Sequence, residues 1–468
     1  MQKVFRHCGN LDKRCYEKYH LSEDLLMEHA ALGMAQIIRQ KFIAGSSVLI
    51  VAGKGNNGGD GIALARLLCI DYAIRLHIPF EVKSEMAQLQ LVRALALGIE
   101  TTQNIYDADV IVDAILGSGV TGELGNEILE LIERLNTLSG YKIACDIPTG
   151  ISIDGQILTN AFAADITVTM GAYKEALFLD EAKDFVGKIV RVDLGLPASF
   201  YEDESDMFVL EKSDLSLPIR KKLVTHKGSF GHAAIFCGEK EGASVISGEA
   251  ALRFGAGLVT LVMQQKYFIP PCLMHSSTLP KNTTAIALGM GLGHDFEESF
   301  LDKFVLNNAL PLVLDADAFY SPKLLSLLTQ NGRSIVLTPH PKEFVSMWKI
   351  LIEEEISVSD LQSYRFEYAK RFTYLYPNAV LLLKGANSII AHKGYVYINP
   401  LGCSNLSKGG SGDVLSGLIV SLLAQGYDAL DAAINGSLAL TLAARRYSGA
   451  NYAMTSMDLV NNLAYLED

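Results

Sequence analysis

Four short glycine-rich segments constrain the fold of this chain more than any other feature of its sequence. They are residues 53–61 (GKGNNGGDG), 116–125 (LGSGVTGELG), 289–293 (GMGLG) and 408–412 (KGGSG). The first three directly follow short apolar runs (SVLIVA, DVIVDAI and TAIAL), which are typical of fully buried strands. Helix-length apolar segments follow several of the loops, for instance residues 61–70. Short buried strands that alternate with helices predict an α/β fold with a parallel sheet covered on both faces.

The alternation of strands and helices occurs twice, so we expect two different α/β domains. A chain of 468 residues has room for two or three domains of roughly 100–200 residues. We interpret the charged segment 199–222 as a linker and expect domains at 1–210 and 211–468. The expected strands of the first series are 47–52, 109–115, 142–146 and 165–170, ending near 192–196, and those of the second are 233–237, 258–263, 284–288, 311–314, 334–338 and 379–383.

Charge and composition exclude several classes of partner. The formal net charge is −12, which argues against a broad nucleic-acid footprint, because such a footprint needs clustered Lys and Arg. The apolar run 414–424 is shorter than the about 20 residues that cross a bilayer, and the opening MQKVFRHCGNLDKR lacks the apolar core of a signal peptide. Seven cysteines without C-x-x-C spacing suggest neither a disulfide framework nor a zinc site. We expect a cytoplasmic protein that binds neither nucleic acid nor membrane, and we expect a homo-oligomer.

The first glycine-rich loop contains a formal dinucleotide-binding fingerprint. Gly53, Gly55 and Gly58 have G-x-G-x-x-G spacing between an expected strand and an expected helix, which favours a nicotinamide-dependent dehydrogenase. Asp60 argues against that function, because a carboxylate at the helix N-terminus repels a phosphate and competes for the same N–H donors. Taken alone, Asp60 could also simply cap the helix that follows.

Two further carboxylates end expected strands of the first domain. Asp113 ends VIVDAI and Asp146 ends KIACD, and the carboxyl ends of parallel strands are where such sheets bind ligands. Oxygen ligands suit a hard cation rather than zinc, while one of the carboxylates could instead be a general acid or base. The oxygen-rich pocket that they would form also includes Asp60, Asn56, Asn57 and Thr149.

The motifs of the first half resemble those of a known family. GKGNNGGDG, VDAILGSG, CDIPTG and ADITVTMGAYK are similar to the N-terminal domain of the bifunctional NAD(P)H-hydrate repair enzymes, and SEDLLMEHA resembles that family's first helix. The resemblance implies a Rossmann-like three-layer α/β/α domain that epimerises hydrated NADH and NADPH (NADHX and NADPHX). It implies a K⁺ ion held by Asn57, Asp113 and Thr149, where the family usually has Ser at the position of Thr149 and the hydroxyl is retained. The implied substrate-binding residues are Asn56, Asn57, Gly58, Gly59, Asp60, Gly117, Ser118, Gly119, Val120, Thr121, Gly122, Glu123 and Asp146.

Elementary chemistry is compatible with a catalytic Asp146 in such a domain. The hydrate carries a hydroxyl on a ring carbon next to nitrogen, so the C–O bond can break and re-form through a stabilised cation. A positioned carboxyl group can protonate the departing hydroxyl and then deprotonate the returning water. By the resemblance, Asp146 contacts the substrate near its reacting carbon.

The second half contains an expected anion-binding turn. Residues 409–413 (GGSGD) open the apolar helix 414–424, and the N–H groups of a glycine-rich turn at a helix N-terminus bind anions. Asp413 could take the proton of a hydroxyl that attacks a phosphoryl group, although the segment could also be only a tight turn with a helix-terminal carboxylate. No Walker or protein-kinase spacing is present. Polar groups at other expected strand ends favour a functional site, namely Asp315, Asp317, His340, Lys384, Asn387 and Ser388.

These second-half motifs resemble the ribokinase-like superfamily, and more narrowly the nucleotide-dependent NAD(P)HX dehydratase domain. The similar motifs, among them HKGSFGHAAIFCG, DADAF, TPHPKEF and KGGSGDVLSG, extend from residue 226 to about 420. The resemblance implies that Ala243, Gly291, His340 and Asp413 contact the hydrate, with Asp413 as catalytic base. It implies ADP as co-substrate and Mg²⁺, with the adenine nucleotide bound by Lys384, Gly385, Ala386, Asn387, Ser388 and Gly412. The family often has Gly at Lys342, and Cys403 is interpreted as an ordinary loop thiol.

The sequence therefore predicts a bifunctional repair enzyme that epimerises NAD(P)HX and dehydrates the S epimer with ADP, giving AMP and phosphate. An alternative is a ribokinase-like small-molecule kinase fused to a Rossmann-like nucleotide-binding domain, which would accumulate a phosphorylated product. In a further alternative the first half is a non-catalytic scaffold, for which Asp60, Asp113 and Asp146 would be unnecessary.

Overall fold

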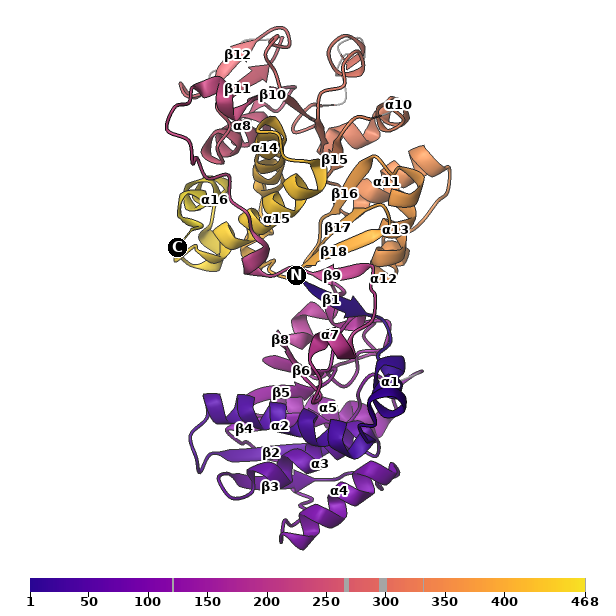
Figure 1. Cartoon of the computed structure of the whole chain (residues 1–468). Coiled ribbons are helices and arrows are strands. Elements are labelled where there is room, and N and C mark those ends of the chain that lie inside the picture. The colour runs from indigo at the N-terminus through magenta and orange to yellow at the C-terminus, as the bar shows by residue number, and fades with distance from the viewer. Residues whose placement is uncertain (120–121, 265–268, 294–300, 331, 468) are drawn as a thin grey trace. The chain divides into compact units, whose positions relative to one another are not determined.

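The computed structural model describes residues 1–119, 122–264, 269–293, 301–330 and 332–467 (Figure 1). The chain divides into two compact units, Lys3–Ser205 on one side and Asp206–Asp468 with Met1–Gln2 on the other. The expectation that 199–222 is only a linker was wrong. This segment includes α7 (Ala198–Tyr201) and β9 (Met207–Val209), and β9 pairs in parallel with β18 (Tyr395–Asn399) of the second unit.

The first unit is built on a six-stranded parallel sheet. Its order is β3-β2-β4-β5-β6-β8, and the predicted strands are confirmed, with β3 in addition. The strands are β2 (Ser47–Ala52), β3 (Ala73–His77), β4 (Val110–Ala114), β5 (Tyr141–Cys145), β6 (Ile166–Met170) and β8 (Lys188–Val192). In addition, β1 (Gln2–Phe5) pairs in parallel with β7 (Tyr173–Lys174). The helices are α1 (Gly9–Tyr19), α2 (Glu23–Lys41), α3 (Asn56–Leu68), α4 (Glu85–Ala96), α5 (Asn126–Thr137) and α6 (Lys183–Val186).

Alternate residues of the central strand β2 enter two different cores. Val48 and Ile50 belong to a cluster that includes the buried face of α2, whereas Leu49 and Val51 belong to a smaller cluster with Leu131 and other α5 residues. Successive strand side chains point to opposite faces, so a strand buried on both sides must be apolar throughout. The continuous run SVLIVA therefore specifies a sheet between two helical layers, which confirms the predicted α/β/α class.

The order in which strands are added to this sheet reverses at β2. β3 follows β2 in sequence and lies on one side of it, while β4 lies on the other side. The loops after β2 and β4 therefore diverge at a topological switch point, where open α/β sheets form a ligand crevice.

The second unit has its own mixed sheet, in the order β12-β11-β10-β13-β14-β15-β16-β17-β18-β9. The strands from β12 to β16 are parallel, and β17 runs antiparallel to both of its neighbours. The strands are β10 (His232–Phe236), β11 (Leu258–Val262), β12 (Met274–Ser276), β13 (Ala285–Leu288), β14 (Leu312–Leu314), β15 (Ile335–Leu337), β16 (Ala379–Leu383), β17 (Ser388–His392) and β18. The α-helices described are α8 (Glu241–Arg253), α10 (Leu324–Leu328), α11 (Pro341–Ile352), α12 (Val358–Ser363), α13 (Arg365–Leu375), α14 (Ser411–Ala424), α15 (Ala429–Arg445) and α16 (Ser456–Asn462).

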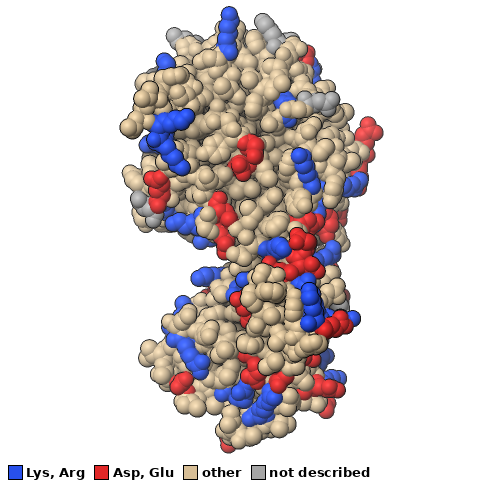
Figure 2. All heavy atoms as spheres, viewed as in Figure 1, with Lys and Arg blue, Asp and Glu red and all other residues tan. Residues whose placement is uncertain are grey.

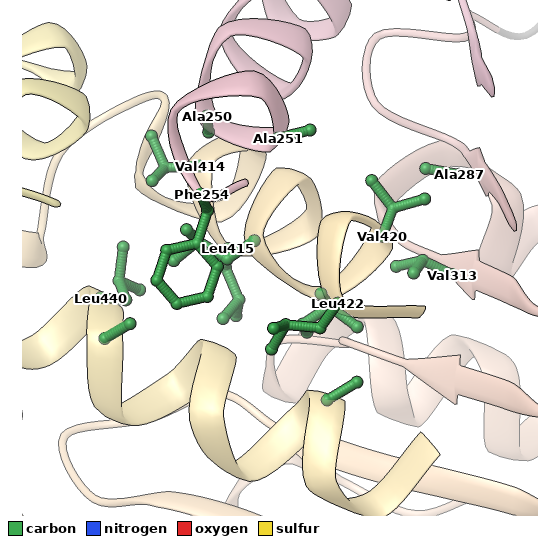
Figure 3. Packing of buried hydrophobic residues seen from close by; sticks show 14 of the residues in the cluster. Ala250, Ala251, Phe254, Ala287, Val313, Val414, Leu415, Val420, Leu422 and Leu440 are labelled. Atoms are coloured by element: carbon green, nitrogen blue, oxygen red, sulfur yellow. The ribbon is translucent and has the colours of Figure 1, made fainter. Parts of the chain in front are cut away.

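Helix α14 runs through the core of this unit. Figure 3 shows Val414, Leu415, Val420 and Leu422 of α14 packed with Phe254 and other apolar side chains. All its residues from 414 to 424 are buried, as expected for a helix that is apolar all round. Its N-terminal turn, residues 411–413, is half-buried and forms the predicted anion site.

Three of the expectations from composition can be compared with the structure. The seven cysteines are all free thiols. Within the described residues, no helix is both long and apolar enough to cross a membrane. On the face of the molecule in Figure 2, Lys and Arg side chains are interspersed with Asp and Glu.

Candidate functional site

A cavity of about 1040 Å³ opens at the switch point of the first unit. It lies where the loop after β2, the loop after β4 and the end of β5 meet, with α1 and α2 as further walls. Of the predicted substrate-binding residues, Asn56, Asn57, Asp60, Gly117, Ser118, Gly119, Glu123 and Asp146 line it. Gly58, Gly59 and Gly122 are described but are not among its lining residues, and Val120 and Thr121 lie outside the described residues.

Glycine permits the two loops to approach each other closely. A Cβ on Gly53 would lie 1.9 Å from the Ile115 carbonyl oxygen, and a Cβ on Gly58 would lie 2.0 Å from the Gly53 oxygen. No side chain fits at either position. The fingerprint glycines therefore have a packing role that brings the two strand ends together.

Asp113, Thr149 and Asn57 converge on the loop at Leu116 and Gly117. The Asp113 carboxylate accepts hydrogen bonds from the Thr149 backbone N–H at 2.8 Å and from its hydroxyl at 2.7 Å. Burial raises the pKa of Asp113 to about 6, although these hydrogen bonds oppose the rise. Thr149 also accepts a hydrogen bond from the Leu116 N–H, while a Cβ on Gly117 would lie 3.2 Å from the Asn57 amide.

The side-chain amide of Asn57 is buried and, within the described part of the chain, both its oxygen and its nitrogen lack a hydrogen-bond partner. A buried polar group without a partner is costly, so it points to a ligand. An amide oxygen, a carboxylate and a hydroxyl are the donor types that a hard cation binds. The residues present therefore fit the predicted K⁺.

Asp146 forms a buried ion pair with Lys174. Lys174 Nζ lies 2.6 Å from Asp146 Oδ1, and both side chains line the cavity. Asp146 has a φ of 69°, a conformation that residues other than glycine rarely adopt and that is mostly retained at functional sites. Burial is the largest influence and would lower the pKa of Lys174. The Asp146 charge and hydrogen bond, together with Cys8 and Asp12, outweigh it, so the net pKa lies above the ordinary value.

One wall of this cavity was not predicted from the sequence. This wall is one face of α1 and its N-terminal cap, where Cys8, Asp12 and Tyr16 follow at intervals of four residues. All three side chains line the cavity, and Lys174, which was not predicted either, lines it with them. Tyr201 donates a hydrogen bond to Asp12 at 2.7 Å, and burial raises the Asp12 pKa. The spacing of 8, 12 and 16 was a visible signal, but it is also the spacing of any helical face.

In the second unit, Lys384 stands at the centre of the predicted nucleotide site. Its Nζ lies 2.8 Å from Asp315 Oδ1 and 3.7 Å from a Glu343 carboxylate oxygen. Ser416 of α14 donates to the other Asp315 oxygen at 2.7 Å. A Cβ on Gly412 would lie 3.5 Å from Lys384 Nζ, so this ammonium faces the N-terminal turn of α14. A cation beside a helix N-terminus forms a site for an anion.

Asp413 occupies the first turn of α14, which begins after Gly410 in a left-handed conformation (φ 93°). Ser247 of α8 donates to the Asp413 backbone carbonyl at 2.8 Å and anchors this turn. Burial, followed by the charge of Asp315, raises the pKa of Asp413 to about 6, while Lys384 opposes the shift. The carboxyl is therefore poised to exchange a proton near neutral pH.

The other predicted residues of this half lie on neighbouring loops. His340 caps α11, and its Nε2 lies 3.2 Å from the buried Glu343, whereas the Lys342 side chain is exposed. Ala243 and Gly291 are neighbours, since a Cβ on Gly291 would lie 3.1 Å from the Ala243 Cβ. Lys384, Gly385, Ala386 and Asn387 form the turn from β16 to β17, Ser388 begins β17, and Cys403 lies in a loop.

Known proteins are similar to this chain over both units. The family described as "YjeF-related protein N-terminus" matches residues 23–176, and the one described as "NAD(P)H-hydrate dehydratase" matches residues 233–464. The bifunctional NAD(P)H-hydrate repair enzyme Nnr of Helicobacter pylori is 42% identical, with 100% of each chain covered. The chain belongs to the bifunctional NAD(P)H-hydrate repair enzyme family. The family resemblance predicted from the motifs is thereby confirmed.

Further members of the repair enzyme family match less closely. The Coxiella burnetii enzyme is 32% identical, with 95% of each chain covered, and the Escherichia coli enzyme is 32% identical, with 88% of this chain and 83% of the relative covered. Among solved structures, the Bacillus subtilis ADP/ATP-dependent NAD(P)H-hydrate dehydratase, co-crystallised with ATP/Mg²⁺, is 27% identical with a TM-score of 0.45, covering 53% of this chain and 92% of that chain. In the present chain, the match to the first family begins at residue 23, so helix α1 lies before the matched region.

Proposed function

We propose that this chain repairs hydrated nicotinamide nucleotides in two steps, one in each unit. The region 1–210 epimerises the R and S forms of NADHX and NADPHX, and the region 211–468 dehydrates the S form with ADP, giving AMP and phosphate. The observation that carries this proposal is the similarity of the full chain to a bifunctional repair enzyme. In agreement with it, Asp146 lines the cavity of the first unit and Asp413 lies in the first turn of α14 in the second. Homo-oligomerisation and a cytoplasmic location stay predictions.

In the first unit, the hydrate would occupy the cavity with its reacting ring near Asp146. The loop residues from Asn56 to Asp60 and from Gly117 to Glu123 would bind the nucleotide. Asn57, Asp113 and Thr149 would hold K⁺, which supplies fixed positive charge near the nucleotide when bound. The Asn57 amide supports this assignment, because a bound ion would satisfy its buried oxygen.

In the second unit, Asp413 would take the proton of the substrate hydroxyl. The hydroxyl oxygen then forms a bond to the terminal phosphorus of ADP, and the bond from that phosphorus to the bridging oxygen breaks, so AMP leaves. Elimination of the phosphate restores the ring double bond, with electrons supplied by the ring nitrogen and loss of a neighbouring C–H proton. Ala243, Gly291 and His340 would position the hydrate for the attack by its hydroxyl.

The adenine nucleotide would lie between the Lys384–Ser388 turn and Gly412. Lys384 Nζ would lie 3.5 Å from a Cβ on Gly412, so it is next to the first turn of α14, and both would contact the transferred phosphoryl group. Mg²⁺ is commonly held by one or two carboxylates together with substrate phosphates, and it would neutralise phosphate charge here.

The test is recovery of reduced-nicotinamide absorbance from the hydrated cofactor, with ADP and separately with ATP. We expect recovery together with equimolar phosphate, whereas a small-molecule kinase would accumulate a phosphorylated product. Asp413→Asn should lower dehydration by at least about 10²-fold, the lower end of general-base contributions, and should leave epimer interconversion intact. No recovery with either nucleotide would refute the dehydratase assignment.

A further inference from the structure

Six carboxyl groups and two ammonium groups line the cavity of the first unit, and the inner ones gather around the Lys174 ammonium. Asp12 of α1, Asp60 of α3 and Asp146 after β5 all line it, and Lys174 lines it with them. The charge of Asp146 raises the pKa of Asp12, and the charges of Asp146 and Asp12 both raise the pKa of Asp60. Two ammonium groups cannot balance six carboxylates, and like charges that share a site do not all ionise. At least one of the three is therefore favoured in its protonated form.

The three carboxyls differ in their partners. Asp146 Oδ1 contacts the Lys174 ammonium at 2.6 Å and accepts the Met170 N–H at 3.2 Å. Asp12 accepts the Tyr201 hydroxyl at 2.7 Å. Among the described residues, no donor or cation contacts the Asp60 carboxyl group. A proton taken up by this cluster is therefore favoured at Asp60, the group with no donor to stabilise its charge.

The ammonium of Lys174 uses all of its hydrogen-bond donors within this cluster. Its ammonium has three N–H donors, and it contacts Asp146 Oδ1 at 2.6 Å, the Thr169 hydroxyl at 3.0 Å and the Met170 carbonyl at 3.1 Å. None of its donors remains for a substrate phosphate. It holds one oxygen of Asp146, and among the described residues Asp146 Oδ2 has no partner.

Resting on the proposed epimerase function, we propose that Asp60 is its general acid and that Lys174 is a positioning residue, which fixes Asp146 as a carboxylate beside the ring. This gives to Asp60 the proton transfers that the sequence assigned to Asp146, and leaves Asp146 as a fixed negative charge. Asp60 gives its proton to the substrate hydroxyl as the C–O bond breaks, and water is formed. The ring nitrogen lone pair moves to the C–N bond, and the resulting cation lies beside the Asp146 carboxylate.

The return step restores every group. Water attacks the opposite face of the cation, the C–N π electrons return to nitrogen, and the surplus water proton passes to Asp60. No oxidant, reductant or net proton is consumed. Two carboxyls whose surroundings favour opposite protonation states can take different roles, here a proton donor and a fixed charge beside the cation.

The direction of the Asp60 titration supports this division. Burial, and then the charges of Asp146 and Asp12, hold the pKa of Asp60 well above its ordinary value, while Lys174 opposes the shift. Besides Asp12, Asp146 and Lys174, the titratable groups around Asp60 are Cys8, Tyr16, Glu23, Lys54, Glu123 and Glu127 of the cavity lining, and Cys145.

The first experiment measures conversion of the purified R hydrate to the S hydrate by the full chain carrying Asp413→Asn, which does not consume either epimer. Adding Asp60→Asn should slow conversion by about 10²-fold or more and remove the fall in rate at alkaline pH. Asp184→Asn, an exposed carboxyl of α6, is the matched control and should change nothing. If the reference chain converts the epimers and Asp60→Asn converts them within threefold of it, the general-acid role is refuted. If the reference chain itself fails, the epimerase function is refuted.

The second experiment is a double-mutant cycle. Lys174→Gln should slow conversion about tenfold and move the alkaline limb to higher pH, since the opposing cation is gone, and Lys174→Arg should restore most of the rate. With Asp146→Asn present, Lys174→Gln should add little further loss. The positioning role would be refuted if the rate losses of Lys174→Gln and Asp146→Asn multiply in the double variant. It would also be refuted if Lys174→Gln slows conversion without moving the alkaline limb of the pH profile. If circular dichroism shows that Lys174→Gln does not fold, the Lys174→Arg variant tests the role instead. Because Lys174→Arg keeps the positive charge, the alkaline limb of its pH profile should stay where it is in the reference chain, and a shifted limb would refute the positioning role.

Discussion

Both units place a lysine near the aspartate that we assign to catalysis, but they pair it differently. In the first unit Lys174 contacts Asp146 itself at 2.6 Å. In the second unit Lys384 contacts Asp315 at 2.8 Å, and Asp413 has no ion pair among the described residues. A direct ion pair keeps a carboxylate charged, whereas a cation bound to another group leaves the base free to exchange its proton. The same two residue types therefore produce a fixed charge in one site and a proton acceptor in the other.

The backbone positions of the two aspartates match this difference. Asp146 lies on a strand end in a left-handed conformation, and its carboxyl is fixed at Oδ1 by Lys174 and the Met170 N–H. Asp413 lies in a helical first turn that Ser247 anchors through the backbone carbonyl. Within the described part of the chain its carboxyl has no bound cation, which leaves it able to exchange a proton.

The largest expected effect comes from removing the second ammonium. Lys384→Met should lower dehydration by about 10²–10³-fold, because a charge that stabilises the transferred phosphoryl group is lost. It should also move the acid limb of the pH profile upward. Asp413 must be deprotonated to act, its pKa is about 6, and Lys384 normally lowers that value. Steady-state rates between pH 5 and pH 8 measure both effects.

The matched control for that variant is Lys342→Met, because Lys342 is an exposed lysine at the start of α11. It should leave the dehydration profile unchanged. An acid limb that stays in place in Lys384→Met would contradict the argument that Lys384 acts on Asp413 through space.

A smaller effect is expected from the cation of the first unit. Replacing K⁺ by Na⁺ should lower the thermal stability of this unit by roughly 1–3 kcal/mol, the range for an ion present at about 10–100 times its Kd. Asp113→Asn should abolish the difference between the two salts, and Asp184→Asn should retain it. Thermal unfolding in matched chloride salts measures this. An equal midpoint in both salts would refute the K⁺ assignment.

The strands were predictable where burial was complete. SVLIVA and AVLLL are continuous apolar runs, and both form the expected strands, β2 and β16. β3 was missed because AIRLH is half-exposed with two polar residues. β17 and β18 were missed as well, although the Lys393-Gly394 turn between them, with both φ values positive, is a recognisable hairpin signal.

The site was predictable where a motif and a strand end coincided. Asn57, Asp113 and Thr149 stand at such points, and the structure brings all three to one loop. Lys174 was not singled out, because a lysine followed by glutamate in a short strand has no local signal for burial. Its role depends on the Asp146 contact across 28 residues, and only the folded chain shows that contact.

The smallest expected effect tests whether the second site depends on its outer hydrogen bonds. Ser416→Ala removes the donor to Asp315 Oδ2 but leaves the Lys384 ion pair in place. Losing one such bond to a charged group costs about 1.5–3 kcal/mol, and part of this should appear as a several-fold fall in dehydration. Ser421→Ala is the matched control, because Ser421 is also buried on α14 but bonds to Phe254, away from the site. It should lower stability without lowering the rate. Equal losses of rate in the two variants would mean that α14 contributes through its packing, and that Lys384 needs no support from Ser416.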